Sequence, residues 1–180
     1  MALSARHDPQ VRSFALPTVN SGPVAMLAGL ALTVYALFQT FYLLKLPVVA
    51  IRRMAEATAD PAIQDIAARA ANQAARINAA GGVPANAWEA FGAIDLAVAG
   101  LTAAAVALVV LQSLGHVGAA VGRYAWLLAT GAVALVAFRM LVPPVPAEAH
   151  DYVRLGSGAW MVLAGTCLVW LGAVVHAVRR

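Results

Sequence analysis

The stretch Ala90–Leu114, AFGAIDLAVAGLTAAAVALVVLQSL, contains one charged residue among its 25 residues. A bilayer core is ~30 Å thick and needs roughly 20 apolar residues at about 1.5 Å each, so this stretch is long enough to cross it as a helix. Three further apolar stretches of similar length lie at 23–44, 124–142 and 155–178. The sequence therefore predicts an all-α fold, an integral membrane bundle of four spanning helices.

The composition favours a membrane protein over a soluble domain. The chain of 180 residues is 62% hydrophobic and 11% charged, whereas soluble domains carry roughly 25% charged residues. We predict a polar N-terminal tail over 1–21 and a single four-span domain over 22–180. The net charge is +4, but the basic residues flank the spans and form no basic–aromatic run. This arrangement favours the lipid bilayer, and not nucleic acid, as a partner.

The first loop contains start and stop signals for an additional helix. Asp60-Pro61 has the pattern of an N-cap followed by a first-turn proline, and Gly81-Gly82 is a stop signal, so a helix is predicted over about 61–80. One face of this helix is apolar and carries Ile63, Ile66, Ala70 and Ile77. Because this stripe is thin, we expect an amphipathic helix that needs the membrane surface or the bundle to persist.

Small residues recur at helical spacing within the spans. The fourth span has one glycine per heptad, at Gly158, Gly165 and Gly172, and the second and third spans carry alanine seams. In lipid, small residues let helix backbones approach closely, so that van der Waals contact drives their association. The seams predict a left-handed bundle. An alanine-rich composition alone would produce the same pattern in the second and third spans.

Basic residues are unequally divided between the two sides of the predicted bundle. The side of the first loop carries Lys45, Arg52, Arg53, Arg69, Arg76, Arg139 and Arg154. The other side carries Arg6, Arg12, Arg123, Arg179 and Arg180. Because basic loops stay preferentially in the cytoplasm, we expect the first loop on the cytoplasmic side of a plasma or inner membrane.

Two charged residues, Asp95 and Arg139, lie inside hydrophobic runs. The short connection between the second and third spans predicts antiparallel neighbours, which would bring both charges to the same leaflet. An unpaired charge at that depth is costly, so we expect an ion pair or a shared polar pocket. The alternatives are a binding or proton site, a clamp of the bundle, or an arginine that extends to the interface. No zinc-type Cys/His cluster or phosphate-binding glycine loop occurs in the sequence, and no metal is expected.

The segment that opens the second span, Asn86-Ala-Trp-Glu89-Ala-Phe91, has the spacing of a helix capping box. It also resembles the Asn-x-x-Glu segment of the MAPEG family (membrane-associated proteins in eicosanoid and glutathione metabolism). Three arginines follow the order of that family: Arg52 after the first span, Arg139 at the end of the third and Arg154 at the start of the fourth.

The resemblance implies a trimer of four-helix bundles that binds glutathione between its subunits. It would place Asn86, Glu89 and Arg139, together with Arg52 and Arg154, around this cofactor. Arginine suits the task because it can hold each of the two carboxylates of glutathione bidentately.

The residues leave two main functions open. The small-residue seams and the few functional groups favour a non-catalytic helical subunit or scaffold, acting as a homo-oligomer or with other membrane subunits. The resemblance favours a glutathione-dependent transferase or peroxidase that acts on a lipophilic substrate. A small transporter that uses Asp95 is a third alternative, but no inverted repeat is evident in the sequence. Whether the chain is an enzyme stays open.

Overall fold

The computed structural model describes residues 21–178, without the side chains of residues 90, 91, 121, 122, 147 and 148. The tail predicted over 1–21 lies outside the described residues, except for Ser21, which begins the first helix. The four terminal arginines of the charge comparison, at positions 6, 12, 179 and 180, also lie outside them.

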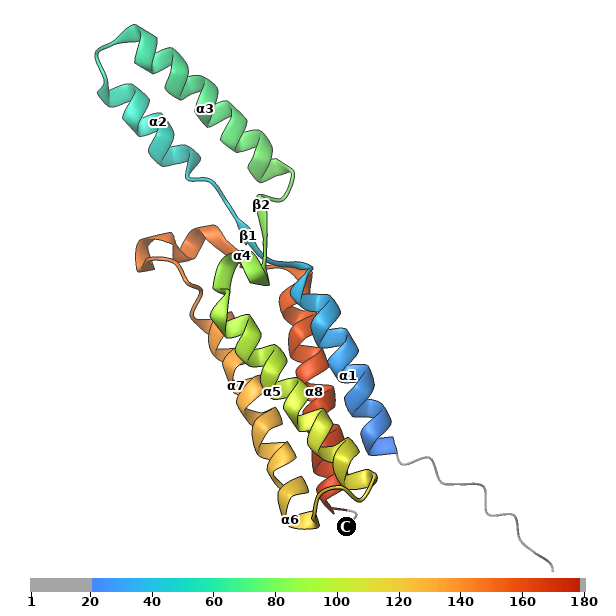
Figure 1. Cartoon of the computed structure of the whole chain (residues 1–180). Coiled ribbons are helices and arrows are strands. Elements are labelled where there is room, and N and C mark those ends of the chain that lie inside the picture. The colour runs from blue at the N-terminus through green and yellow to red at the C-terminus, as the bar shows by residue number, and fades with distance from the viewer. Residues whose placement is uncertain (1–20, 179–180) are drawn as a thin grey trace, which may run out of the picture.

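Four long helices lie side by side and form the body of the molecule (Figure 1). They are α1 (Ser21–Leu37), α5 (Ala93–Ser113), α7 (Tyr124–Leu141) and α8 (Ser157–Val178). Among the described residues, α5, α7 and α8 are long and apolar enough to cross a membrane, whereas α1 is a shorter apolar helix of 17 residues. The predicted membrane protein is therefore supported by three candidate spans.

A three-stranded antiparallel sheet lies at one end of the bundle, so the all-α prediction was wrong in this part. The central strand is β1 (Thr40–Leu44), which pairs with β2 (Val83–Asn86) on one side and β3 (Val153–Leu155) on the other. The first span, predicted over 23–44, was too long because its last residues form β1. These residues include β-branched and aromatic side chains, which favour a strand where partners exist on both sides.

The other predicted spans agree better with the helices. The third, 124–142, matches α7, and the fourth begins two residues late, at Ser157, because its first residue belongs to β3. The second is interrupted at Gly92, where φ is 50°. A short helix precedes this glycine, and two further short helices lie in the loops: α4 (Ala87–Phe91), α6 (Ala119–Gly122) and the 3-10 helix η1 (Ala147–Tyr152).

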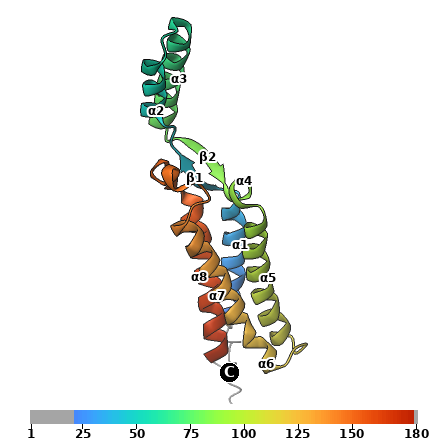
Figure 2. The same cartoon turned by 90° about the vertical axis from the view of Figure 1, so that its left-hand side faces the viewer.

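A helical hairpin projects from the sheet away from the bundle, as both Figure 1 and Figure 2 show. It consists of α2 (Val48–Ala57) and α3 (Pro61–Ala79), and β1 and β2 connect it to the bundle. The helix predicted over 61–80 is confirmed as α3. It packs against α2 and not against the bundle, so of the two expected supports the bundle is not the one used, and contact with the membrane surface stays a prediction.

Capping groups at its two ends explain where α3 begins and ends. The Asp60 carboxylate accepts a hydrogen bond from the Ala62 amide at 2.8 Å and so caps the helix. At the other end Gly81 and Gly82 have φ of 112° and 98°, values that favour glycine. The Asn78 side chain joins this end to the chain before α2, because it bonds both the amide and the carbonyl of Leu46, at 2.8 and 2.9 Å.

Helices α1 and α8 pack through facing glycines, which confirms the close approach predicted from the heptad. A Cβ atom on Gly29 would lie 2.6 Å from the Gly165 carbonyl oxygen, and one on Gly172 would lie 2.8 Å from the Gly22 carbonyl oxygen. The two pairs are seven residues apart on each helix and run in opposite directions, so α1 and α8 are antiparallel. No larger residue fits these positions without moving a backbone.

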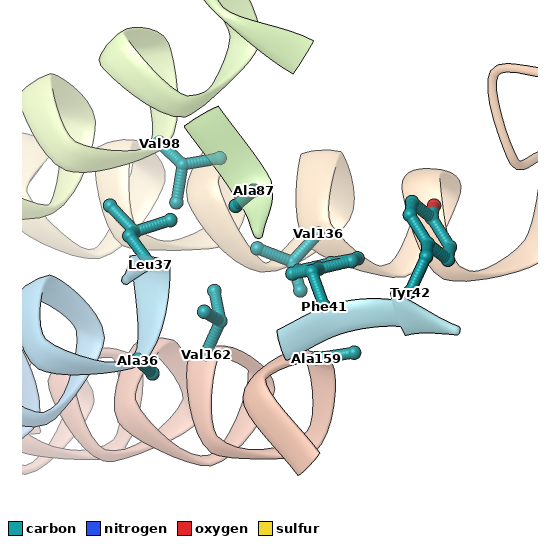
Figure 3. Packing of buried hydrophobic residues seen from close by; sticks show 9 residues of the cluster. All are labelled: Ala36, Leu37, Phe41, Tyr42, Ala87, Val98, Val136, Ala159 and Val162. Carbon is teal, nitrogen blue, oxygen red and sulfur yellow. The ribbon is translucent and has the colours of Figure 1, made fainter. Parts of the chain in front are cut away.

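The core beneath the sheet receives side chains from all four long helices, and Figure 3 shows them gathered: Ala36, Leu37, Val98, Val136, Ala159 and Val162. Phe41 and Tyr42 of β1 join the same cluster and cover its end. β1 therefore closes the bundle with buried aromatic residues and carries them to the level of Asp95 and Arg139.

Candidate functional site

Asp95 of α5 and Arg139 of α7 line one small cavity at the sheet end of the bundle. The cavity has a volume of about 10 Å³, and its other walls are apolar: Leu37, Phe41, Ile94, Val98, Leu135, Val136 and Val162. This is about the smallest space that holds one water molecule. The two charges therefore line a common cavity, but its other walls are apolar where a polar pocket was expected. α5 and α7 are neighbours as expected.

Asp95 is a buried carboxylate in an apolar wall. Its side chain is 3% exposed, and its Oδ2 atom has no hydrogen-bond partner among the described residues. Burial of a lone charge costs several kcal/mol, so a compensating group is needed nearby. The guanidinium of Arg139 supplies the opposite charge, which acts on Asp95 electrostatically.

Tyr42 extends this polar cluster and was missed by the sequence reasoning. Its hydroxyl donates a hydrogen bond of 2.5 Å to the carbonyl oxygen of Arg139. Burial raises the pKa of Tyr42 to about 12, while the charge of Arg139 lowers it and that of Asp95 raises it. Tyr42 therefore stays a protonated donor at neutral pH. A buried tyrosine needs a hydrogen-bond partner for its hydroxyl. This need was the signal that could have pointed to Tyr42.

A second cavity, of about 270 Å³, lies on the outer side of Tyr42, between the sheet and the loop after α7. It is lined by Tyr42, Leu44, Ala85, Glu89, Pro144, Val145 and Val153. Among the described side chains, Glu89 is the only charged residue that lines it, and Glu89 is exposed. The cavity therefore combines apolar walls with one phenol and one carboxylate.

Asn86 and Glu89 form the capping box that the sequence predicted. The Asn86 Oδ1 atom accepts from the Glu89 amide at 2.9 Å, and the Glu89 Oε2 atom accepts from the Asn86 amide at 3.1 Å. The neighbouring Trp88 packs its ring 5.8 Å from that of Phe38. Its buried indole nitrogen has no hydrogen-bond partner in the described part of the chain.

Arg52 and Arg154 lie apart from this cluster. Arg52 belongs to α2 and lines an open groove of about 560 Å³ on the hairpin. Arg154 is exposed and pairs in register with Leu43, which lies between the two cavity-lining residues Tyr42 and Leu44. Because strand side chains alternate, Arg154 lies on the opposite face of the sheet. Within one chain, the structure brings Asp95 and Arg139 together with Glu89 nearby, but not these two arginines.

The opposite end of the bundle contains a second polar pair. The buried His176 of α8 lies with its Nε2 atom 3.1 Å from the Oε1 atom of the buried Gln112 of α5. Within residues 21–178, no group of three or more His, Cys, Asp or Glu side chains is placed to hold a metal ion. The described bundle thus has one cluster of interacting polar side chains at each end.

Comparisons with family models, with curated proteins and with solved structures give no match for this chain.

Proposed function

We propose that this protein is a non-catalytic membrane scaffold, in which a four-span bundle anchors the projecting α2–α3 hairpin. α1 joins α5, α7 and α8 as a span in this proposal. Its 17 residues correspond to about 26 Å, close to the ~27 Å core of a thin bilayer. The glycine contacts with α8 support this placement, because they hold α1 alongside a helix long enough to cross.

The hairpin faces the cytoplasm of a plasma or inner membrane in this proposal. Lys45, Arg52, Arg53, Arg69 and Arg76 lie on the hairpin or at its base, and Arg154 lies in the adjoining sheet. At the opposite end of the bundle, Arg123 immediately precedes α7. Positive charge next to a span favours cytoplasmic retention, and it suits the anionic headgroups of that leaflet.

The observation that carries the scaffold proposal is the exposed apolar surface of the hairpin. Met54, Ile63 and Ile66 are 69%, 49% and 66% exposed, although the hairpin extends beyond the bundle and so into water. Large apolar side chains exposed together outside a membrane mark an interaction site. A binding element on a membrane anchor is the arrangement of a scaffold.

A deletion of the hairpin tests this proposal. Leu44 pairs with Val83 at the hairpin end of the sheet, so residues 45–82 can be replaced by Asn-Gly, which closes a two-residue turn between β1 and β2. We expect the full chain to retain a stoichiometric partner, a second copy or another subunit, during purification in mild detergent. The shortened chain should remain folded in the membrane and lose that partner.

Two outcomes would contradict the scaffold proposal. One is a full chain that stays strictly monomeric and alone after chemical crosslinking in membranes. The other is a shortened chain that retains the partner in full, since the bundle would then be the binding element.

A glutathione-dependent transferase or peroxidase of MAPEG type is the second candidate. The 270 Å³ cavity supports it, because Glu89 lines this cavity and Tyr42 connects it to Arg139. Glutathione at millimolar concentration should then raise the thermal stability of the purified protein, and a homotrimer should be present. Glu89→Gln and Arg139→Ala should each abolish the shift. Absence of any shift or binding heat would exclude this candidate.

A further inference from the structure

The cavity of about 270 Å³ beside Tyr42 has no role in the scaffold proposal. Its volume equals that of about nine water molecules in the liquid, which is close to the lower limit for pockets that hold small organic ligands. Most of its lining residues are apolar: Leu44, Ala85, Pro144, Val145 and Val153. A space of this size and character suits the apolar body of a small molecule.

One carboxylate of this cavity is held in place before any ligand arrives. The Glu89 Oε2 atom accepts a hydrogen bond of 3.1 Å from the Asn86 amide, as part of the capping box of α4. A carboxylate has about four acceptor sites, so this one bond leaves capacity for further donors. Because Glu89 is exposed, the cavity reaches the surface of the molecule at this residue.

Other groups around the cavity are committed as donors elsewhere. The Tyr42 hydroxyl donates its hydrogen to the carbonyl oxygen of Arg139. In the loop after α7, Pro144 has no amide hydrogen, and the Val145 amide donates to the Pro143 carbonyl oxygen at 2.8 Å. An anion needs donors around it, whereas a cation that donates can use the carboxylate. The lining therefore favours a cationic ligand.

We propose that this cavity binds a small protonated amine with an apolar body. The ammonium group donates charge-assisted hydrogen bonds to the Glu89 carboxylate, and the body packs against the apolar walls, from Leu44 and Ala85 on the sheet to Val145 on the loop. This inference goes beyond the scaffold proposal and does not depend on it.

An ammonium group could come from a free amine or from the headgroup of an amino phospholipid. In the headgroup the phosphate is only an ethylene group away from the ammonium, so it would lie close to the Glu89 carboxylate and be repelled by it. Tyr42 and Val145 offer this phosphate no donor. The cavity therefore favours an amine that carries no phosphate.

Calorimetric titration of the purified full chain in detergent tests the proposal, with the heat of partition into empty micelles subtracted. The probe is 2-phenylethylamine, which combines an ammonium with an apolar ring, and it should bind saturably. 2-Phenylethanol, which has the same ring without the charge, should bind roughly tenfold more weakly. Phosphoethanolamine, which represents the lipid headgroup, should show no binding.

A matched pair of variants separates the charge of Glu89 from its structural role. Glutamine also forms capping boxes at this position, so Glu89→Gln keeps α4 capped while it removes the charge. We expect this variant to bind 2-phenylethylamine roughly tenfold more weakly than the wild type. Glu56→Gln makes the same change of net charge on the exposed side of α2, outside the cavity, and should leave the affinity unchanged.

A steric variant checks that the amine enters the cavity and does not merely pair with an exposed carboxylate. Ala85→Leu narrows the cavity from its sheet wall, so it should also weaken binding of 2-phenylethylamine. The melting temperature of each variant, measured without probe, shows that the chain is folded before it is titrated.

Four results would overturn the amine proposal. They are no saturable binding of 2-phenylethylamine, equal affinities for the amine and the alcohol, unchanged affinity in Glu89→Gln, and binding of phosphoethanolamine as tight as that of 2-phenylethylamine. None of them bears on the scaffold proposal, which the deletion of residues 45–82 tests separately.

Discussion

The two antiparallel helix pairs of this molecule, α1–α8 and α2–α3, are packed in opposite ways. α1 and α8 meet through glycine, with backbone against backbone, and Gly29 and Gly165 leave no space for a Cβ atom. α2 and α3 meet through alanine, and leave Met54 and Ile66 largely exposed. The first pair is packed backbone to backbone within one chain, whereas the second leaves large apolar side chains exposed.

The difference agrees with the proposed placement of the first pair in lipid and of the second in water. In lipid, apolar side chains gain nothing by moving from the surrounding tails into a helix contact, so close backbone contact has to hold a helix pair together. In water the same apolar surface drives association by roughly 25 cal/mol per Å² buried. Close glycine contacts therefore suit a helix pair in lipid, and exposed isoleucine would suit a helix pair that binds a partner in water, as proposed for the hairpin.

The largest effect is expected from filling the glycine contact between α1 and α8. A Cβ on Gly165 would lie 2.5 Å from the Thr33 hydroxyl and 2.8 Å from its amide nitrogen. Gly165→Leu should therefore prevent recovery of monodisperse protein. Gly100→Leu is the matched control, since a Cβ there meets no described atom within 4 Å. Equal yields of the two variants by size-exclusion chromatography would contradict the backbone contact.

The buried charges at the sheet end should have the next largest effect. Arg139→Met leaves the Asp95 carboxylate buried without its compensating charge, which costs about 3–5 kcal/mol in comparable sites. The double variant Asp95→Leu with Arg139→Met should recover most of this loss, as a double-mutant cycle of unfolding in detergent can measure. A cost below about 0.5 kcal/mol for Arg139→Met would mean that the arginine only extends to the interface.

Much of the bundle could be predicted from sequence, because the signals were local and long. The run that became α7 begins with Tyr124 and ends before Pro143, and its predicted bounds of 124–142 hold to within one residue. Asp60-Pro61 and Gly81-Gly82 fixed both ends of α3 for the same reason. The heptad glycines of α8 predicted a close contact with another helix, but they did not show that this helix is α1.

The sheet could not be predicted, because its signals are non-local. Thr40–Leu44 follows the apolar run of α1 with only Gln39 and Thr40 as polar residues at the junction, and a short apolar run does not distinguish strand from helix. Its partners Val83–Asn86 and Val153–Leu155 are about 40 and 110 residues away in the sequence. One strand contains Pro84, which argues locally against a strand.

In the candidate site, too, local signals could be used for prediction and non-local ones could not. The proximity of Asp95 and Arg139 followed from antiparallel neighbours and the cost of a buried charge. The positions of Arg52 and Arg154 depended on the hairpin and on the register of β3, which no local pattern specified. Tyr42 was missed because its role follows from a strand that was itself missed.

Loss of the Tyr42 hydroxyl should have a moderate effect on the bundle. Tyr42→Phe removes the hydrogen bond to the Arg139 carbonyl and should cost about 1 kcal/mol of unfolding free energy. Burial also raises the pKa of Tyr42 to about 12, above the value of ~10 in the unfolded chain. This contribution is therefore complete below pH 10 and is lost as the pH rises toward 12.

Thermal unfolding from pH 8 to 12 checks the sign of this effect. Across pH 10–12 the wild type should lose more stability than Tyr42→Phe, so the two curves should converge. Parallel curves over this range would show that the phenol of Tyr42 titrates alike in the folded and unfolded chains.

The smallest effect is expected within the hairpin, and it should stay there. Asp60→Ala removes the cap on the Ala62 amide and should cost about 1 kcal/mol in α3. Amide hydrogen exchange in α3 should then accelerate roughly fivefold, while α8 is unchanged because no described bond links Asp60 to the bundle. Asp65→Ala, which breaks only the exposed pair with Arg69, should cost less than about 0.5 kcal/mol. Acceleration in α8 to the same degree would mean that hairpin and bundle unfold as one cooperative unit, and the contrast between the two helix pairs would then not extend to their stability.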